Sequence, residues 1–301
     1  MKRTPSPRPS RRRWRKVFLG AAVVLAVAVA VLFPRWREAT KNGGQQYAEP
    51  FRIADNFYYV GANDVTAFLI TGPEGHVLID GGYPGTAPMI LASIAELGFD
   101  VEDVAVLLNS EPHYDHAGGL AELQEASGAE LWASDASADV LAAGGNDPDI
   151  AGPIRVLMWT GLTRYPAPRV DRRFGDGDTL RVGPTAITAH LTPGHTRGCT
   201  SFSFPVRDGD QELTAVYACS LVRLGGTRYD EQGADFEQTF DVLRGLPADV
   251  WVTAHAREWG RYRKFVRSDS LANPVDAFVD REGYRAYVDR GERRFREGAV
   301  Q

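Results

Sequence analysis

The sequence predicts a mixed α/β protein. Short apolar runs that suit strands recur in both halves of the chain, and stretches with helical spacing lie between them. The chain has 301 residues, of which 44% are hydrophobic, so it can bury a large core. Two cysteines are too few for a disulfide framework or a thiolate zinc site, and the fold must therefore depend on that core.

The N-terminal region differs from the rest of the chain. Residues 1–16 carry eight Lys and Arg and no acid, and residues 17–33 are uncharged. This pattern predicts either a cleaved export signal or a retained anchor in the inner membrane, and hence a periplasmic or exported protein. Residues 34–47 are polar and glycine-containing, and they predict a linker to a domain over residues 48–301. Because the whole chain has a net charge of −5, its body is strongly acidic, which argues against nucleic-acid binding.

The first half of the domain predicts strands followed by alternating helices and strands. Two β-rich runs, at 66–71 and 76–82, flank a Gly-Pro-Glu-Gly turn and predict a hairpin. Helical spacing of apolar residues predicts a helix over 85–98, and the apolar run at 103–110 predicts a buried strand. A further helix is expected from Ala117 to Ala126.

The second half repeats the mixture of strands and helices. The expected order is two strands around Gly183-Pro184, strands at 199–206 and 212–220, a helix from about Asp235 to Leu246, and a buried strand at 249–256. An amphipathic helix over 273–298 closes the chain, with five apolar residues on one face: Phe278, Tyr284, Tyr287, Val288 and Phe295. Residues 144–173 have no clear period and predict a long loop that covers the site.

Possible metal ligands gather where several of these runs end. The segment LLNSEPHYDHAGGL, at 107–120, holds four of them, and two histidines follow later apolar runs. The six candidate ligands are Glu111, His113, Asp115, His116, His195 and His255. Zinc accepts imidazole nitrogen and carboxylate oxygen, and a catalytic site keeps one position open for water. We therefore predict a site for one or two cations; His76 and His190 lie inside strand patterns and receive no role in it.

The motifs of the chain resemble the metallo-β-lactamase superfamily. Four of them occur in the family's order: LIDGG (78–82), EPHYDHAGG (111–119), TPGHTRG (192–198) and TAHA (253–256). The resemblance covers roughly residues 50–300 and is most similar to the third subclass of class B β-lactamases. It implies a four-layer αββα sandwich as a single domain, with the site at the sheet edge between its halves.

The resemblance also implies two zinc sites. The implied ligands are Glu111, His113 and His195 for the first zinc, and Asp115, His116 and His255 for the second. The family has a histidine where Glu111 stands. Because a carboxylate reaches about as far and also binds zinc, we expect a working but weakened or altered first site. The alternative is a glutamate that only hydrogen-bonds near a single zinc.

The implied activity is hydrolysis of the β-lactam ring by attack of zinc-bound hydroxide, with one or two Zn²⁺ per chain. Asp115 is the catalytic residue that orients the hydroxide, Ser220 matches a family position that contacts the substrate carboxylate, and Arg223 adds a positive charge nearby. Two alternatives remain: a lactonase or other ester or amide hydrolase, and a non-enzymatic membrane-tethered protein with a decayed site. We expect a small-molecule substrate and a monomer.

The two cysteines, Cys199 and Cys219, flank a predicted strand pair. A turn centred on Gly209 would place them opposite each other, where they could form a disulfide after export, whereas a turn of two residues would separate them. We expect buried free thiols and assign neither cysteine to the metal.

Overall fold

The computed structural model describes residues 46–300 except 160 and 162, together with five isolated positions between 20 and 31. The predicted signal or anchor at 17–33 and nearly all of the predicted linker therefore lie outside the described residues. Of the helices described, none is long and apolar enough to cross a membrane. The chain from Gly44 onward forms one compact unit.

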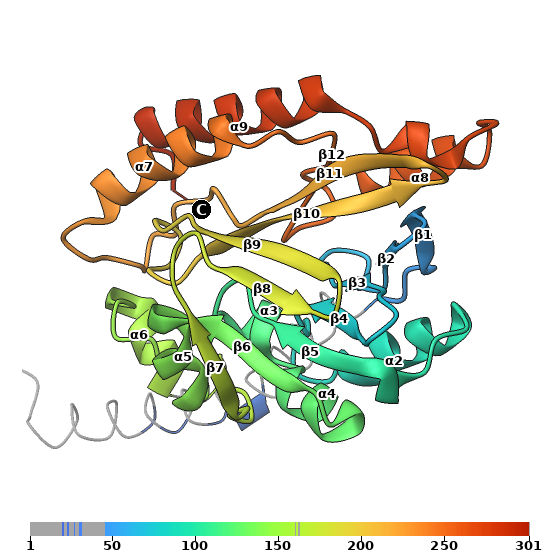
Figure 1. The fold of residues 1–301 in the computed structure, drawn as a ribbon. Coiled ribbons are helices and arrows are strands. Elements are labelled where there is room, and N and C mark those ends of the chain that lie inside the picture. The colour runs from blue at the N-terminus through green and yellow to red at the C-terminus, as the bar shows by residue number, and fades with distance from the viewer. Residues whose placement is uncertain are drawn as a thin grey trace, which may run out of the picture. The chain divides into compact units, whose positions relative to one another are not determined.

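Two β-sheets pack against each other in this unit (Figure 1). The first sheet has the strand order β1 (Phe51–Ala54), β2 (Phe57–Tyr59), β3 (Phe68–Ile70), β4 (His76–Ile79), β5 (Val104–Leu108), β6 (Glu130–Ser134) and β7 (Val170–Phe174). The second sheet has the order β12 (Val250–Thr253), β11 (Gln211–Ala218), β10 (Thr200–Asp208), β9 (Thr185–Leu191) and β8 (Thr179–Val182).

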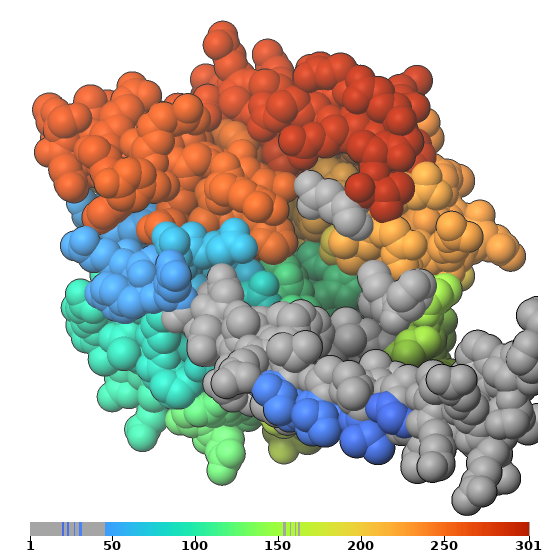
Figure 2. Space-filling view, turned by 180° about the vertical axis from the view of Figure 1, so that it is seen from behind, coloured from blue at the N-terminus to red at the C-terminus, as the bar shows by residue number. Residues whose placement is uncertain are grey.

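Helices cover the outer face of each sheet. The first sheet carries α2 (Ala87–Glu96), α4 (Leu120–Ser127) and α5 (Asp135–Ala142), and the second carries α7 (Gln232–Gly245) and α9 (Arg281–Arg296) (Figure 1). The remaining described helices are α3 (Tyr114–Ala117), α6 (Gly152–Trp159), α8 (Arg261–Ser268) and the 3₁₀ turns η1 (Val101–Asp103) and η2 (Pro274–Ala277). The predicted αββα sandwich is confirmed. Figure 2 shows the orange and red C-terminal segments above the light-blue and teal segments of the first half.

The core lies mainly between the two sheets. Phe57 and Phe68 from the first sheet meet Phe204 and Tyr217 from the second, and all four side chains are buried. The rings of Phe57 and Phe204 pack edge to face with centroids 5.0 Å apart, a geometry favoured by aromatic pairs. Burying each such side chain stabilises the fold by roughly 1.5–3 kcal/mol, which is why apolar runs in the sequence located the strands.

The parallel part of the first sheet positions the functional residues. Strand β5 runs parallel to β4 and β6, and four of its five residues are buried, as its continuous apolar run predicts. Because the carboxyl ends of parallel strands meet at the same edge of a sheet, the segments that follow β4 and β5 emerge side by side.

Several predicted element boundaries are wrong. The helix expected from Ala117 begins at Leu120, because Gly118 and Gly119 separate it from the short helix α3. The stretch at 144–173, expected to be a loop, contains α6 and the start of β7. Val156 and Trp159 on α6 are exposed, so no regular apolar face marks this helix in the sequence.

The closing helix is also shorter than predicted. Its first part is the 3₁₀ turn η2, and α9 starts only after Asp280, whose Oδ1 accepts a hydrogen bond from the Gly283 amide at 2.9 Å. Phe278 is buried but precedes α9, whereas Tyr284, Tyr287 and Val288 form the buried face of α9 as expected. Helix α7 lies within three residues of its predicted start and one of its predicted end.

Candidate metal centre

The loop after β5 carries four of the six candidate ligands, and close glycine packing holds it in place. A Cβ atom on Gly119 would lie 2.3 Å from the carbonyl oxygen of Gly81, and one on Gly118 would lie 2.2 Å from Pro84. Only glycine permits so close an approach of two backbones. The glycines of LIDGG and HAGG therefore fix the ligand loop against the end of β4.

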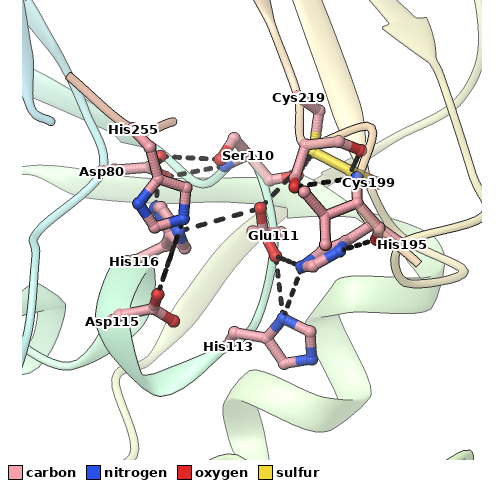
Figure 3. Close-up of polar contacts among 12 residues, drawn as sticks. Asp80, Ser110, Glu111, His113, Asp115, His116, His195, Cys199, Cys219 and His255 are labelled. Carbon is pink, nitrogen blue, oxygen red and sulfur yellow. Dashed lines mark hydrogen bonds and ion pairs between the residues drawn. A yellow bond between two sulfur atoms is a disulfide. The ribbon is translucent and has the colours of Figure 1, made fainter. Parts of the chain in front are cut away.

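The first ligand cluster consists of Glu111, His113 and His195 (Figure 3). Glu111 Oε2 lies 2.8 Å from His113 Nδ1 and 2.9 Å from His195 Nε2, and the two ring nitrogens lie 3.1 Å apart. His195 comes from the loop after β9, so strand ends from both sheets meet here. The structure thus brings together the three residues predicted for the first metal.

The second ligand cluster consists of Asp115, His116 and His255 (Figure 3). Asp115 Oδ2 lies 3.5 Å from His116 Nε2 and 4.0 Å from His255 Nε2. His255 follows β12, and the rings of His116 and His255 lie edge to face with centroids 5.4 Å apart. The residues predicted for the second metal are therefore also neighbours, at wider spacing than those of the first.

Glu111 lies between the two clusters. Its Oε2 faces the first cluster, and its Oε1 is 3.8 Å from His116 Nε2 of the second. Its side chain is fully buried. Burial alone would raise the pKa of Glu111, but the charges of His195 and His116 and the hydrogen bonds from the first-cluster histidines hold that pKa well below its usual range. The carboxylate is therefore ionised and available as a ligand.

Asp80 orients His116 and is a functional residue that the sequence reasoning did not single out. Its Oδ2 lies 3.5 Å from His116 Nδ1, which leaves Nε2 of that ring facing the cluster. Asp80 is held in turn by Ser110, whose amide and hydroxyl both donate to it, and by the Tyr217 hydroxyl at 2.7 Å. The LIDGG motif contains Asp80, and this position has a left-handed backbone (φ 63°), which Asp tolerates better than most residues. An Asp directly before two glycines was therefore the signal in the sequence.

The donor set fits a bound cation. His195 Nδ1 faces the Val222 carbonyl at 2.6 Å and can only donate there, so the neutral ring presents a lone pair at Nε2 to Glu111 Oε2. Two acceptors at 2.9 Å repel each other unless a proton or a metal ion supplies positive charge. Three N and O donors in each cluster match the ligand types and number that zinc uses in catalytic sites.

The expectation of free thiols is wrong, because Cys199 and Cys219 form a disulfide. Strands β10 and β11 are joined by a turn of two residues, in which Asp208 pairs with Gln211. This register was expected to separate the cysteines. They bond because both lie just outside the paired strands, where the chain ends can converge independently of the register. A disulfide sulfur is not a thiolate, and Cys219 Sγ lies 3.8 Å from Glu111 Oε1.

A cavity of about 320 Å³ opens onto both clusters. Its walls include four candidate ligands, together with Ser220, which was predicted to bind substrate. Arg223, the other predicted substrate residue, is not among the lining residues; Arg257 is, and the sequence reasoning missed it. Residues 145–163 contribute Gly145, Asp147, Ile150 and Thr163, so the segment expected to cover the site does border it.

The family of the chain follows from comparison with known proteins. The model of the metallo-beta-lactamase superfamily matches residues 60–255, and the chain belongs to this superfamily. Its structure is similar to Rm3 metallo-beta-lactamase, with a TM-score of 0.78 and 39% identity over 84% of this chain and 94% of that chain. It is also similar to BJP-1, a subclass B3 metallo-beta-lactamase of Bradyrhizobium japonicum, with a TM-score of 0.76 and 30% identity over 86% and 96% of the chains. The resemblance to the third subclass is confirmed.

Curated relatives carry a different name. The hydroxyacylglutathione hydrolase of Jannaschia sp. (strain CCS1) is 28% identical over 213 residues, which are 70% of this chain and 69% of that relative. The chain spans about half the length of two further curated relatives with the same name. The chain is therefore a hydrolase of the metallo-beta-lactamase superfamily with candidate metal-binding residues.

Proposed function

We propose that the protein is a zinc-dependent hydrolase that opens the β-lactam ring of antibiotics. The observation that carries this proposal is the pair of three-residue clusters that share one cavity, in a chain similar to subclass B3 enzymes along most of its length. The cavity of about 320 Å³ falls within the range of roughly 300–1,000 Å³ used for small-molecule ligands.

The chain's own side chains suit this reaction. Bound zinc polarises a carbonyl group and makes water a nucleophile near neutral pH. The Asp115 carboxylate lies at the cavity wall and is ionised, because the charge of His116 outweighs the effect of burial and keeps the Asp115 pKa low. It can orient the attacking water and accept its proton at Oδ2. Ser220 lines the same cavity and can donate a hydrogen bond to the substrate carboxylate, and Arg257 on the cavity wall, rather than Arg223, supplies positive charge there.

A second candidate is thioester hydrolysis, and the curated relatives support it. A hydroxyacylglutathione hydrolase acts by its name on a thioester of glutathione, and the same clusters could serve a thioester, lactone or amide carbonyl. We place the β-lactam first because the similar metallo-beta-lactamase structures are matched over 94–97% of their own length, whereas the curated relatives are matched over 52–71% of theirs.

A substrate panel tests the proposal. The purified, zinc-loaded protein is assayed with a penicillin, a cephalosporin, a carbapenem, a lactone and S-lactoylglutathione, with His255→Ala as the control for contaminating activity. We expect β-lactam turnover that chelation and His255→Ala both abolish. Turnover of only the lactone or the thioester would show that the substrate belongs to that class and not to the β-lactams. Absence of turnover with every substrate would favour a non-enzymatic binding protein.

We also propose that the protein is exported and monomeric. The basic segment 1–16 followed by the uncharged segment 17–33 supports export. A fusion that lacks residues 1–33 should remain in the cytoplasm, and normal periplasmic delivery without them would contradict the proposal. Light scattering of the purified protein measures its mass in solution, and the mass of a dimer would contradict the proposed monomeric state.

A further inference from the structure

A second cavity, of about 440 Å³, adjoins the candidate metal cavity. Val222, Arg257 and Glu258 line both cavities, so a bound molecule can extend from one into the other. The other lining residues are Leu221, Tyr287, Arg290, Gly291 and Arg294. We call this space the arginine cavity, because Arg257, Arg290 and Arg294 lie on its walls.

One face of α9 forms much of the arginine cavity. Tyr287, Arg290, Gly291 and Arg294 follow the spacing i, i+3, i+4 and i+7, which places them along one side of a helix. A Cβ atom on Gly291 would lie 2.7 Å from Leu221 Cδ1. This glycine lets α9 approach the segment that carries Ser220, and so it brings two arginines close to the candidate metal cavity.

The arginines of this cavity are free of ion pairs. Among the described residues of 46–300, no salt bridge involves Arg257, Arg290 or Arg294. Of the other arginines of α9, Arg281 pairs with Asp249, and Arg296 pairs with Glu292 and Glu237, whereas the described residues show no salt bridge for Arg285 or Arg293. In a chain with 39 acidic and 34 basic residues, three unpaired arginines on one cavity leave a local excess of positive charge.

The inner wall of the arginine cavity holds a buried tyrosine and one acid. The Tyr287 side chain is 5% exposed, and its buried hydroxyl faces the carboxylate of Glu258. Burial, and then the charge of Glu258, raise the pKa of Tyr287, so the hydroxyl keeps its proton. Glu258 is the only acid among the lining residues, and the three arginines outnumber it.

We propose that the arginine cavity is a subsite for a carboxylate of the substrate. The hydrolysed carbonyl group would lie at the ligand clusters, and the carboxylate would accept hydrogen bonds from Arg257, Arg290 or Arg294. This inference rests on the proposed hydrolytic function for its substrate. It assigns carboxylate recognition to α9 and the segment after β12, in addition to Ser220.

Paired double variants test the subsite by activity. Arg290→Ala/Arg294→Ala removes two arginines of the cavity, and Arg285→Ala/Arg293→Ala removes two exposed arginines of the same helix that do not line it. Both variants change the net charge equally. With benzylpenicillin, the first variant should lower kcat/KM about tenfold, mainly through KM, since each lost charge-assisted hydrogen bond weakens binding. The methyl ester of benzylpenicillin, which lacks the carboxylate charge, should be affected little.

A loss of the same size in both double variants, or with both substrates, would overturn the subsite. A binding measurement separates this outcome from failure of the proposed function. Calorimetric titration of the zinc-loaded protein with glutarate, a small dicarboxylate, needs no turnover. Weaker glutarate binding by Arg290→Ala/Arg294→Ala alone would support the subsite even if no β-lactam were hydrolysed, and equal binding by both variants would refute it.

Discussion

The two ligand clusters use similar side chains at different spacings. In the cluster of Glu111, His113 and His195, donor atoms lie 2.8–3.1 Å apart, and in the cluster of Asp115, His116 and His255 the carboxylate lies 3.5–4.0 Å from the ring nitrogens. Two donor atoms on a tetrahedral zinc lie about 3.3 Å apart, given zinc–ligand bonds of about 2.0–2.1 Å. The second cluster is therefore already open enough for an ion, and the first is contracted.

The contraction follows from the carboxylate at position 111. Glu111 Oε2 can accept hydrogen bonds from His113 Nδ1 and from Nε2 of a protonated His195, so the first cluster can satisfy its own polar atoms with a proton in place of an ion, whereas three neutral imidazoles could not. A metal must replace these contacts before it binds the first cluster. We therefore expect the second cluster to hold zinc more tightly, and the following experiments test this difference.

Metal removal should have the largest effect. Both clusters lie on the wall or floor of one cavity, and the proposed reaction needs a cation there. Treatment with a strong chelator followed by desalting should reduce hydrolysis to the background rate, and added Zn²⁺ should restore it. Full activity in protein whose zinc content is measured as zero would remove both clusters from the mechanism.

Replacement of a histidine in the second cluster should have the next largest effect. His255→Ala removes one of three donors from the tighter site, and we expect turnover to fall by at least about a hundredfold, since changes in residues that only support ligands already cost about 10–100-fold. His190→Ala is the matched control, because His190 pairs with Ser203 outside both clusters. Zinc content measured by mass spectrometry should fall only in His255→Ala, and equal zinc content in both variants would contradict the assignment.

Position 111 tests the contracted cluster. Glu111→Ala should leave the second cluster with its ion but weaken the first, so turnover should fall about tenfold at limiting zinc and recover partly when zinc is added. Glu111→His should keep or tighten zinc binding, because imidazole supplies a neutral nitrogen donor at similar reach. A zinc titration monitored by turnover compares both variants with the wild type. If Glu111→Ala matches the wild type at every zinc concentration, Glu111 is not a ligand.

A change behind the second cluster should have the smallest effect. Asp80→Asn keeps a residue that tolerates the left-handed backbone but removes the charge that orients His116. We expect zinc affinity of the second cluster to fall about tenfold, at the lower end of the range for such supporting residues. Competition with a chromophoric chelator measures this affinity. An unchanged affinity would mean that packing alone orients the His116 ring.

Much of this architecture could be predicted from the sequence, and the errors have physical causes. Short apolar runs located strands because strands bury apolar side chains, and the ends of these runs carried the six candidate ligands. Periodicity failed for α6, whose exposed Val156 and Trp159 break the apolar pattern. The register argument failed at Cys199 and Cys219, because strand register does not govern residues beyond the last pair of the two strands.

The sequence by itself determined the family motifs, the ligand types and the glycines that allow the ligand loop to pack. Only the tertiary structure decided how those ligands are spaced, that Glu111 faces both clusters, and that Arg257 approaches the same cavity as Arg290 and Arg294. The physical reason is that motifs record local chemistry along one segment. Distances between His113 and His195, or between α9 and the end of β12, depend instead on how the two sheets and their helices pack together.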